Sequence, residues 1–539
     1  MNFKKSFVYL PLIFALLLAG GIWLGMQFTG NSSTHQVLRM SGHGNSKIES
    51  ILAYIQSDYV DDIDRKKLEK EAIEAMIASL DPHSDFITAE EFHEMNDPLL
   101  GKFEGIGVSF RIEKDTITVI SPLKGGPSEK VGIMAGDRII FIEDSLVAGV
   151  EVTNRDAMRK LKGDKGTKVR IKVLRRGVDG LIDFTITRDV IPTYSLDIAY
   201  MLDEKTGFIR LNKFSATTHE EFMEAVVELL GKGMNQLVLD LRGNTGGFLS
   251  AARDLADEFL TDGKLIVYTE GKNRPRSFAF ATKKGLLHDF PVAVLIDEGS
   301  ASASEIVAGA LQDNDRGIIV GRRSFGKGLV QEQLPLPDGS AVRLTVARYY
   351  TPTGRSIQKP YNGDKMEYHH EAIERYENGE LMHPDSIHFA DSLKYTTPGG
   401  KIVYGGGGIM PDVYVPLEVD SSLVYYNRLA NSGLLFQFAF EYADTHRPEL
   451  SSYGTPQAFA QQFRFTDKMY SELIAFAAEK GISGADKEKQ AARQKTAILF
   501  KAYVGRNIYD EAGFYPIYRE IDNVLQEALK ALNKAEFLL

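Results

Sequence analysis

The chain has 539 residues, of which 43% are hydrophobic and 25% charged, with a formal net charge of −10 and no cysteine. This length exceeds one ordinary hydrophobic core, so two to four domains are expected. The acidic balance argues against nucleic acid as a partner, because phosphate binding requires a basic face. The lack of cysteine excludes a thiol nucleophile, disulfide bonds and thiolate-bound metals.

The N-terminus predicts export. Lys4 and Lys5 precede an apolar run over residues 7–28. The run approaches the ~20 residues that span a bilayer and exceeds the ~7–15 of a removable signal peptide, and no clean cleavage site follows it. Since positive charge stays on the cytoplasmic side, we predict that residues 1–28 form a transmembrane anchor, in preference to a cleaved signal peptide. The rest of the chain is then expected on the periplasmic side of the cytoplasmic membrane.

Two segments separate this anchor from the first β-rich region. Residues 29–44 are polar and rich in Gly and Ser, which predicts a linker. Residues 45–97 carry apolar residues mostly three or four apart, which predicts an N-terminal helical segment. Within it, Thr88 and Glu91 form a capping-box pattern. Such a unit is more often a packing or dimerisation element than a catalytic one, so a homo-oligomer stays open.

Residues 98–190 show alternating β patterns between Gly-rich turns, with one helix expected over 154–161. The stretch 102–110 (KFEGIGVSF) resembles the carboxylate-binding loop of PDZ domains, and residues 121–147 resemble the segment that follows it in bacterial PDZ modules. Consecutive main-chain N–H groups can bind a peptide C-terminus there, while the adjoining strand edge takes up the peptide as an added strand. The predicted peptide-binding residues are Gly105, Ile106, Gly107 and Val108.

The next region alternates strands with helices, which predicts a sheet covered by helices. A polar segment, 360–400, contains several histidines without recognisable ligand spacing, so a surface insertion is favoured over a metal site. Residues 421–539 are mostly helical and contain no functional motif. The strands expected in the α/β region are 207–211, 237–241, 292–296, 318–320 and 342–350.

Two short stretches are candidates for chemistry: 297–305 (DEGSASASE) and 321–331 (GRRSFGKGLVQ). A hydroxyl nucleophile needs a tight turn, a base and N–H donors for an oxyanion, and the first stretch joins a strand to a helix. No histidine lies close to either stretch in sequence. A lysine can act as the base where burial lowers its pKa, and Lys327 is flanked by glycines that crowd it little.

These stretches resemble the motifs of the C-terminal processing, or tail-specific, serine peptidases, which also contain a PDZ domain. The resemblance implies that Ser302, the middle serine of S-A-S-A-S-E, is the nucleophile. It implies that Lys327 of F-G-K-G is the base and that Gln331 orients this lysine. Catalysis of this type requires no metal and no cofactor.

The same resemblance includes the stretch 240–247 (DLRGNTGG). It implies an oxyanion hole formed by the main-chain N–H of Ala303 and that of a glycine in this stretch. The choice between Gly246 and Gly247 stays open at this point.

The predicted fold class is a multidomain α/β protein. The resemblance covers roughly residues 45–420 and implies a serine endopeptidase that works through an acyl-enzyme. Its substrates would be exported or membrane-associated polypeptides with apolar C-terminal tails. In order, the predicted domains are the N-terminal helical segment, a β-rich PDZ domain with short helices at 98–190, an α/β protease core at 193–420, and a C-terminal helical extension at 421–539.

Other interpretations compete with this one. Serines at a helix start are usually caps, which is retained for Ser300 and Ser304 but not for Ser302, because two motifs support its catalytic role. The stretch 321–327 matches a phosphate-binding loop, but position 328 is Gly where Ser or Thr is needed. The chain also contains the Ser-x-x-Lys and Lys-Thr-Gly motifs of penicillin-recognising enzymes, at 324–327 and 205–207. Their order is the reverse of the order in those enzymes, so this interpretation is rejected. The remaining functional alternative is a non-catalytic PDZ scaffold on a degenerate protease core.

Overall fold

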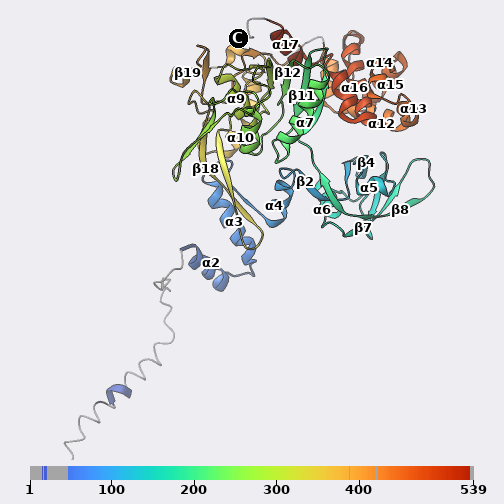
Figure 1. Ribbon diagram of the computed structural model, residues 1–539. Helices are drawn as coiled ribbons and strands as arrows, with labels where there is room; N and C mark the ends of the chain where they lie inside the picture. Colours follow the sequence, from blue (N-terminus) through green and yellow to red (C-terminus); the bar gives the residue numbers. More distant parts are fainter. Residues whose placement is uncertain (1–14, 16, 21–46, 388, 419–422, 535–539) are drawn as a thin grey trace, which may run out of the picture. The chain divides into compact units, whose positions relative to one another are not determined.

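The structure is a computed structural model that describes residues 15, 17–20, 47–387, 389–418 and 423–534 (Figure 1). The predicted linker and most of the predicted anchor lie outside the described residues. Within the described part of the chain, no helix combines the length and apolarity needed to cross a membrane. The chain divides into two compact units, residues 1–76 and 77–539, which are described separately.

The first unit contains helix α2 (Lys47–Asp58) and most of helix α3 (Arg65–Ala78). Arg65 links the two helices, because its guanidinium lies 2.9 Å from Glu49 and 2.6 Å from Glu69. The three residues are only partly buried, so solvent screens these ion pairs and they add little to stability. The helical segment expected from the sequence is thus present.

The second unit begins with strand β1 (Asp85–Ile87) and helix α4 (Ala89–Asn96). Thr88 caps α4: its side chain accepts the N–H of Glu91, and the Glu91 carboxylate accepts the N–H of Thr88. The predicted capping box is confirmed.

The PDZ region forms a sheet in the order β3-β4-β5-β7-β8, with β6 beside β5 and β2 paired separately with β9. Alternate residues of β7 are buried, as expected for a strand with one face on a core. Strand β3 lies at the edge of the sheet. The elements are β2 (Lys102–Gly105), β3 (Val108–Ile112), β4 (Ile117–Pro122), α5 (Pro127–Lys130), β5 (Arg138–Ile142), β6 (Ser145–Leu146), α6 (Asn154–Leu161), β7 (Lys168–Leu174), β8 (Leu181–Thr187) and β9 (Asp189–Pro192).

The predicted protease core is built on a second sheet, in the order β10-β11-β12-β15-β16-β21. β10 is antiparallel to β11, and the other pairings are parallel. Every residue of β12 and β15 is buried, as expected for parallel strands covered on both faces. The strands are β10 (Leu196–Met201), β11 (Thr206–Leu211), β12 (Gln236–Asp240), β15 (Val292–Ile296), β16 (Ile318–Gly321) and β21 (Val413–Tyr414).

Helices cover both faces of this sheet. On one face lie α7 (Thr218–Gly231), α8 (Leu249–Asp257) and α9 (Ala303–Asp313), whose apolar residues share one core with the sheet. The opposite face packs against α17 (Asn523–Leu532), near the end of the chain.

A third sheet carries the segment that follows Lys327. Strand β17 pairs along its length with β18, and β18 in turn pairs with β1 and β13 (Figure 1). The polar segment after it contains helix α10 (Lys365–Glu377), two 3-10 turns (Pro384–Ser386 and Asp391–Leu393) and the pair β19 (Lys394–Thr396) and β20 (Ile402–Tyr404). The sheet strands are β13 (Leu265–Gly271), β14 (Arg274–Phe280), β17 (Leu329–Pro335) and β18 (Ala341–Tyr350).

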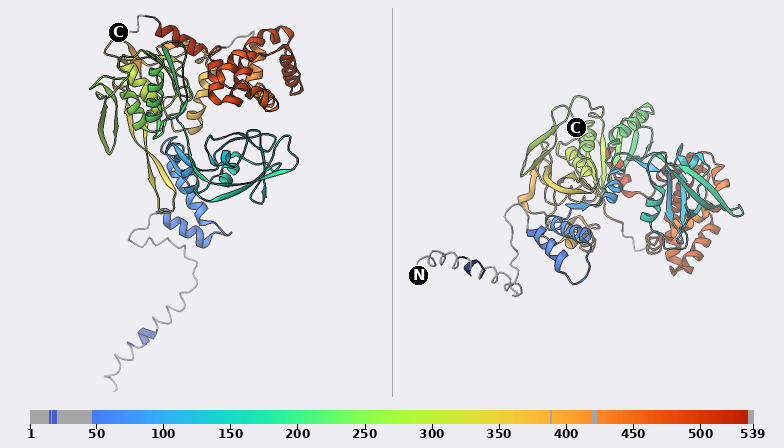
Figure 2. Two further views of the ribbon diagram at one scale, coloured as in Figure 1. Left: turned by 45° about the vertical axis from the view of Figure 1, so that its right-hand side comes forward. Right: turned by 90° about the horizontal axis from the view of Figure 1, so that it is seen from below.

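The C-terminal helices gather into a bundle (Figure 2). The bundle has its own aromatic core, which includes Phe459, Phe463 and Phe500. Its longest helix departs from helical geometry at Tyr509 and Asp510. The predicted multidomain α/β organisation is therefore confirmed. The bundle helices are α11 (Val424–Asn431), α12 (Leu434–Thr445), α13 (Arg447–Ser451), α14 (Pro456–Gln462), α15 (Asp467–Glu479) and α16 (Asp486–Tyr518).

Candidate active site

Ser302 lies between β15 and α9, at the residue preceding the helix. Its backbone has φ 55° and ψ −110°, a conformation that costs a residue other than glycine roughly 1–3 kcal/mol. Surrounding groups hold the turn: the Ser302 N–H donates to Glu305 Oε2 at 2.8 Å, and the Tyr349 hydroxyl donates to the Ser302 carbonyl at 3.1 Å. The strained turn thus presents Ser302 at the junction of a strand and a helix.

Glu305 joins this turn to the loop that carries Lys327. Its fully buried carboxylate accepts four hydrogen bonds: besides Ser302, the donors are the N–H groups of Gly326 (2.7 Å) and Lys327 (2.9 Å) and the hydroxyl of Ser324 (2.5 Å). Burial raises the pKa of the Glu305 carboxyl, and the four donated bonds oppose that rise by stabilising the ionised form. The sequence analysis missed this residue, although Ser302-x-x-Glu305 is a capping-box pattern.

Lys327 lies on the loop between β16 and β17. Its Nζ donates to Gln331 Oε1 at 3.0 Å, and Gln331 Nε2 donates to the carbonyl of His83 at 2.5 Å. Burial lowers the pKa of Lys327, and the charge of Arg343 lowers it further, while the carboxylates of Glu305 and Asp81 act in the opposite direction. A lowered pKa increases the neutral fraction of the amine, as a general base requires.

All the predicted residues of the protease site except Ala303 line one pocket of about 450 Å³. Apolar side chains form much of its wall, which suits an uncharged peptide segment. The lining residues are Ser302, Lys327, Gln331, Gly246, Gly247, Asn96, Leu99, Thr245, Phe248, Leu249, Ile306, Leu329, Val330, Gln333, Arg343 and Tyr349.

The two glycines after β12 differ in their hydrogen bonds. The N–H of Gly246 donates to Asn244 Oδ1 at 2.9 Å, whereas the N–H groups of Gly247 and Ala303 have no acceptor among the described residues. A Cβ on Gly246, which has φ 99°, would lie 2.8 Å from the Cβ of Ser302. Glycine is therefore needed at 246 for close approach, and the N–H of Gly247 stays available to a ligand.

Asn244 couples this glycine loop to the Ser302 turn, a contact that the sequence analysis did not identify. Its side-chain nitrogen donates to the carbonyl of Leu211, and its own carbonyl accepts the N–H of Ala301 and the hydroxyl of Ser304. Ser300 donates in the same way to the carbonyl of Leu241. Ser300 and Ser304, which were expected to cap a helix, instead connect the Ser302 turn to the segment that follows β12.

The 360–400 segment is more than a surface insertion, because charged residues of α10 and its C-terminal turn are buried against the Lys327 loop. Glu380 lies 2.7 Å from Arg323 and 2.8 Å from Arg375, and Arg375 also donates to the Arg323 carbonyl. Lys359 pairs with Glu371 at 2.5 Å. The segment therefore buttresses the loop that carries Lys327.

The predicted peptide-binding residues of the PDZ region lie between β2 and the edge strand β3. Gly107 has φ 69°, and the N–H groups of Ile106 and Gly107 find no acceptor in the part of the chain that the structure describes. Ser128 donates through its N–H and its hydroxyl to the Ile106 carbonyl, at 3.1 and 2.7 Å, which orients the loop. Free N–H groups beside an open strand edge suit a peptide carboxylate.

Fold and site together define a serine-type peptidase with a PDZ domain. The family model of peptidase family S41 matches residues 205–364, that of the PDZ domain matches 105–186, and one for a family of unknown function matches 425–510.

Two curated relatives are each 38% identical to the chain. One is the carboxy-terminal-processing protease of Bartonella bacilliformis, over 347 residues, 64% of this chain and 78% of that protein. The other is the carboxy-terminal processing protease CtpA of Bacillus subtilis, over 340 residues, 62% and 72%. Among solved structures, the photosystem II D1 C-terminal processing protease is 26% identical, with a TM-score of 0.36, covering 68% of this chain and 85% of that one. The chain belongs to the carboxy-terminal processing proteases of peptidase family S41.

Proposed function

We propose that this protein is a Ser302–Lys327 endopeptidase that cuts polypeptides presented by their C-terminal tails. One observation carries the proposal. Ser302 and Lys327 line the same pocket, and a single buried carboxylate, that of Glu305, accepts the backbone N–H of both. Two residues 25 positions apart are thus held in a fixed relation, as a nucleophile and its base require.

The chemistry follows from the groups in the pocket. Neutral Lys327, oriented by Gln331, takes the proton of the Ser302 hydroxyl as its oxygen attacks the scissile carbonyl. The tetrahedral oxyanion accepts hydrogen bonds from the N–H groups of Gly247 and Ala303. Lys327 then returns the proton to the leaving amine, and water hydrolyses the acyl-enzyme. Gly246 lets the loop lie close to Ser302, but its N–H is already bonded to Asn244 and does not reach the oxyanion.

The PDZ region supplies recognition. We assign the terminal carboxylate of the substrate to the N–H groups of Ile106 and Gly107, with the peptide added as a strand along the edge of β3, next to Val108. Gly105 ends the neighbouring strand β2 and allows the chain to turn into this loop. An apolar tail fits because Val108 and Phe110 of the edge strand β3 are apolar and only partly buried.

Export and membrane anchoring remain part of the proposal. They rest on the two lysines and the apolar run of the N-terminus, which predict an anchor and a periplasmic protease domain. Substrates would then be exported or membrane-associated polypeptides. Fusing the first 46 residues to a reporter that is active only outside the cytoplasm tests this: a silent reporter would overturn it.

The test of the catalytic proposal is cleavage of a quenched fluorescent peptide with an apolar C-terminus by the purified full chain. Ser302→Ala and Lys327→Ala are expected to lower kcat/KM by at least about 10³-fold, since either removes a member of the reacting pair. Ser451→Ala and Lys487→Ala, both at exposed positions, serve as matched controls. Binding of the peptide by every protein without cleavage by any would instead favour the non-catalytic scaffold.

A further inference from the structure

The last helix of the described chain is part of the protease core. Val524 and Leu525 of α17 are buried against the parallel sheet, in one cluster with Val238 of β12, Leu295 of β15 and Val320 of β16. Helices on both faces are what a parallel sheet requires. The helix that supplies the second face comes from about 200 residues beyond the catalytic motifs, so the C-terminal region completes the core and does not merely follow it.

Asp522 stands at the start of this helix. Its Oδ1 accepts the N–H of Leu525 at 3.1 Å, which caps α17. The same carboxylate takes both terminal nitrogens of Arg242, with Nη1–Oδ1 2.9 Å and Nη2–Oδ2 2.7 Å. Asp522 is only 5% exposed. A two-pronged pair of this kind fixes orientation as well as distance.

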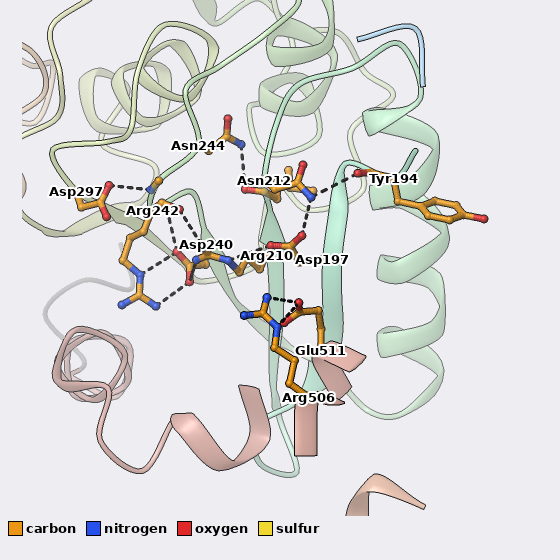
Figure 3. A network of polar contacts seen from close by, with 12 residues as sticks. Tyr194, Asp197, Arg210, Asn212, Asp240, Arg242, Asn244, Asp297, Arg506 and Glu511 are labelled. Atoms are coloured by element: carbon orange, nitrogen blue, oxygen red, sulfur yellow. Dashed lines mark hydrogen bonds and ion pairs between the residues drawn. The ribbon is translucent and has the colours of Figure 1, made fainter. Parts of the chain in front are cut away.

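Arg242 is held from a second side by Asp240, at the end of β12. Its Nε lies 2.9 Å from Oδ1 and its Nη2 2.7 Å from Oδ2 of that carboxylate. Arg210 completes the cluster: its Nη1 donates to Asp240 Oδ2 at 2.7 Å and its Nη2 donates to the Arg242 carbonyl at 2.9 Å (Figure 3). Arg210 also pairs with the half-buried Asp197 at 3.2 Å, so two arginines face two buried aspartates and one half-buried one. The backbone of residue 242 is fixed by the same contacts.

The glycine loop of the active site begins at the next residue. The N–H of Gly243 donates to Asp297 Oδ1 at 2.8 Å (Figure 3), and Asn244 then bonds to the Ser302 turn as described above. Gly246 and Gly247 follow directly. Because glycines contribute no side-chain packing, the position of this loop depends on the residues that anchor its ends.

We infer that Asp522 is a positioning residue for catalysis, acting through Arg242 to fix the loop that presents the Gly247 N–H to the oxyanion. The inference rests on the proposed Ser302 chemistry. It assigns a role to the C-terminal region that lies outside the peptidase match at 205–364. A displaced oxyanion donor lowers the rate of the chemical step and leaves substrate binding nearly unchanged.

Asp522→Asn in the full chain is the sharpest perturbation. Asparagine keeps the shape and is itself a good cap for α17, so the change removes the charge opposite Arg242 while leaving the helix start intact. The matched control is Glu527→Gln, which removes an exposed carboxylate from the same helix. We expect kcat on the quenched peptide to fall at least tenfold in Asp522→Asn with KM within twofold, and neither to change in Glu527→Gln.

A double-mutant cycle separates positioning from general stabilisation. In an Arg242→Met background, Asp522→Asn is expected to cause no further loss of kcat, because its effect passes through Arg242. If Asp522→Asn does not accumulate as folded protein, Arg242→Lys, which keeps the charge and loses the fork, is expected to show the same selective loss of kcat.

Ser302→Ala is run beside these variants, so that the two proposals fail separately. An unchanged kcat in Asp522→Asn with an inactive Ser302→Ala overturns the role of Asp522 and leaves the proposed function standing. A loss of the same size in the Arg242→Met background overturns it as well. Activity in Ser302→Ala overturns the proposed function itself.

Discussion

Glu305→Gln changes only the charge of a fully buried side chain and leaves its shape intact. In the structure, Oε1 accepts from Ser324 and Gly326, and Oε2 accepts from Ser302 and Lys327. A glutamine keeps one acceptor oxygen. In one orientation its amide nitrogen faces the backbone N–H groups of Ser302 and Lys327, so two bonds are lost. In the other it faces the Gly326 N–H and the Ser324 hydroxyl, which can rotate and accept, so one bond is lost.

The size of the effect follows from this count. Hydrogen bonds to a charged group contribute about 1.5–3 kcal/mol each, so losing one or two costs roughly 1.5–6 kcal/mol. Relief of the buried charge offsets part of this, as the raised pKa of Glu305 indicates. We expect a net loss of about 3 kcal/mol, expressed as loosening of the Ser302 turn and the Lys327 loop. Coupled to transition-state geometry, that corresponds to about a hundredfold loss in kcat/KM.

The assay is kcat/KM on the quenched peptide together with hydrogen exchange of peptides covering residues 300–306 and 321–331. Faster exchange in both segments, with unchanged exchange in β12, is the expected pattern. Glu488→Gln is the matched control, because Glu488 occupies the same position of a capping box but accepts a single exposed bond, from Ala485. Parental kcat/KM and exchange in Glu305→Gln would refute the claim that this carboxylate couples the two loops.

Three further predictions concern the surroundings of the dyad. With neutral Lys327 as the proposed base, kcat/KM should rise with pH along a limb that lies below the ordinary lysine value of 10.5. Arg343→Gln removes a charge that lowers the Lys327 pKa, so this limb should move to higher pH; an unmoved pH profile would contradict the assignment. Gly247→Ala should destabilise the core by several kcal/mol, about 3 or more, in urea unfolding, because its Cβ would lie 2.0 Å from a carbonyl oxygen at φ 148°; an unchanged midpoint would argue against it. Glu380→Gln removes the charged partner of two buried guanidinium groups, those of Arg323 and Arg375, and should lower the free energy of unfolding by about 3–5 kcal/mol. Limited proteolysis should then cut α10 faster than in the parent protein, and an unaltered rate would count against this.

The parts of the fold that the sequence predicted are those encoded locally. The buried strand 292–296 coincides with β15, and the helix expected at 154–161 coincides with α6. Both depend on hydrophobic periodicity and on turn residues a few positions away. Ser302 and Lys327 were also proposed from short motifs, and they line one pocket.

What the sequence could not reveal are the pairings between distant polar residues. Asp522 lies 280 positions from Arg242, and Glu380 lies 57 from Arg323. The residues next to a charged side chain in the sequence do not show whether that side chain faces water or a buried partner. Exposure to water is the more frequent outcome. The 360–400 segment was therefore interpreted as surface, and the C-terminal region as an extension.

These long-range pairs share a physical reason. The loops that carry the site are rich in glycine and serine, so apolar packing cannot fix them to within the tolerance that catalysis demands. Buried carboxylates do so instead: Glu305 from α9, Glu380 beyond α10, and Asp522 at the start of α17 each bind a loop that bears a proposed catalytic group or its neighbour. Because none of the three carboxylates lines the substrate pocket, changes in the regions that supply them should alter the rate of the chemical step far more than the affinity for peptide.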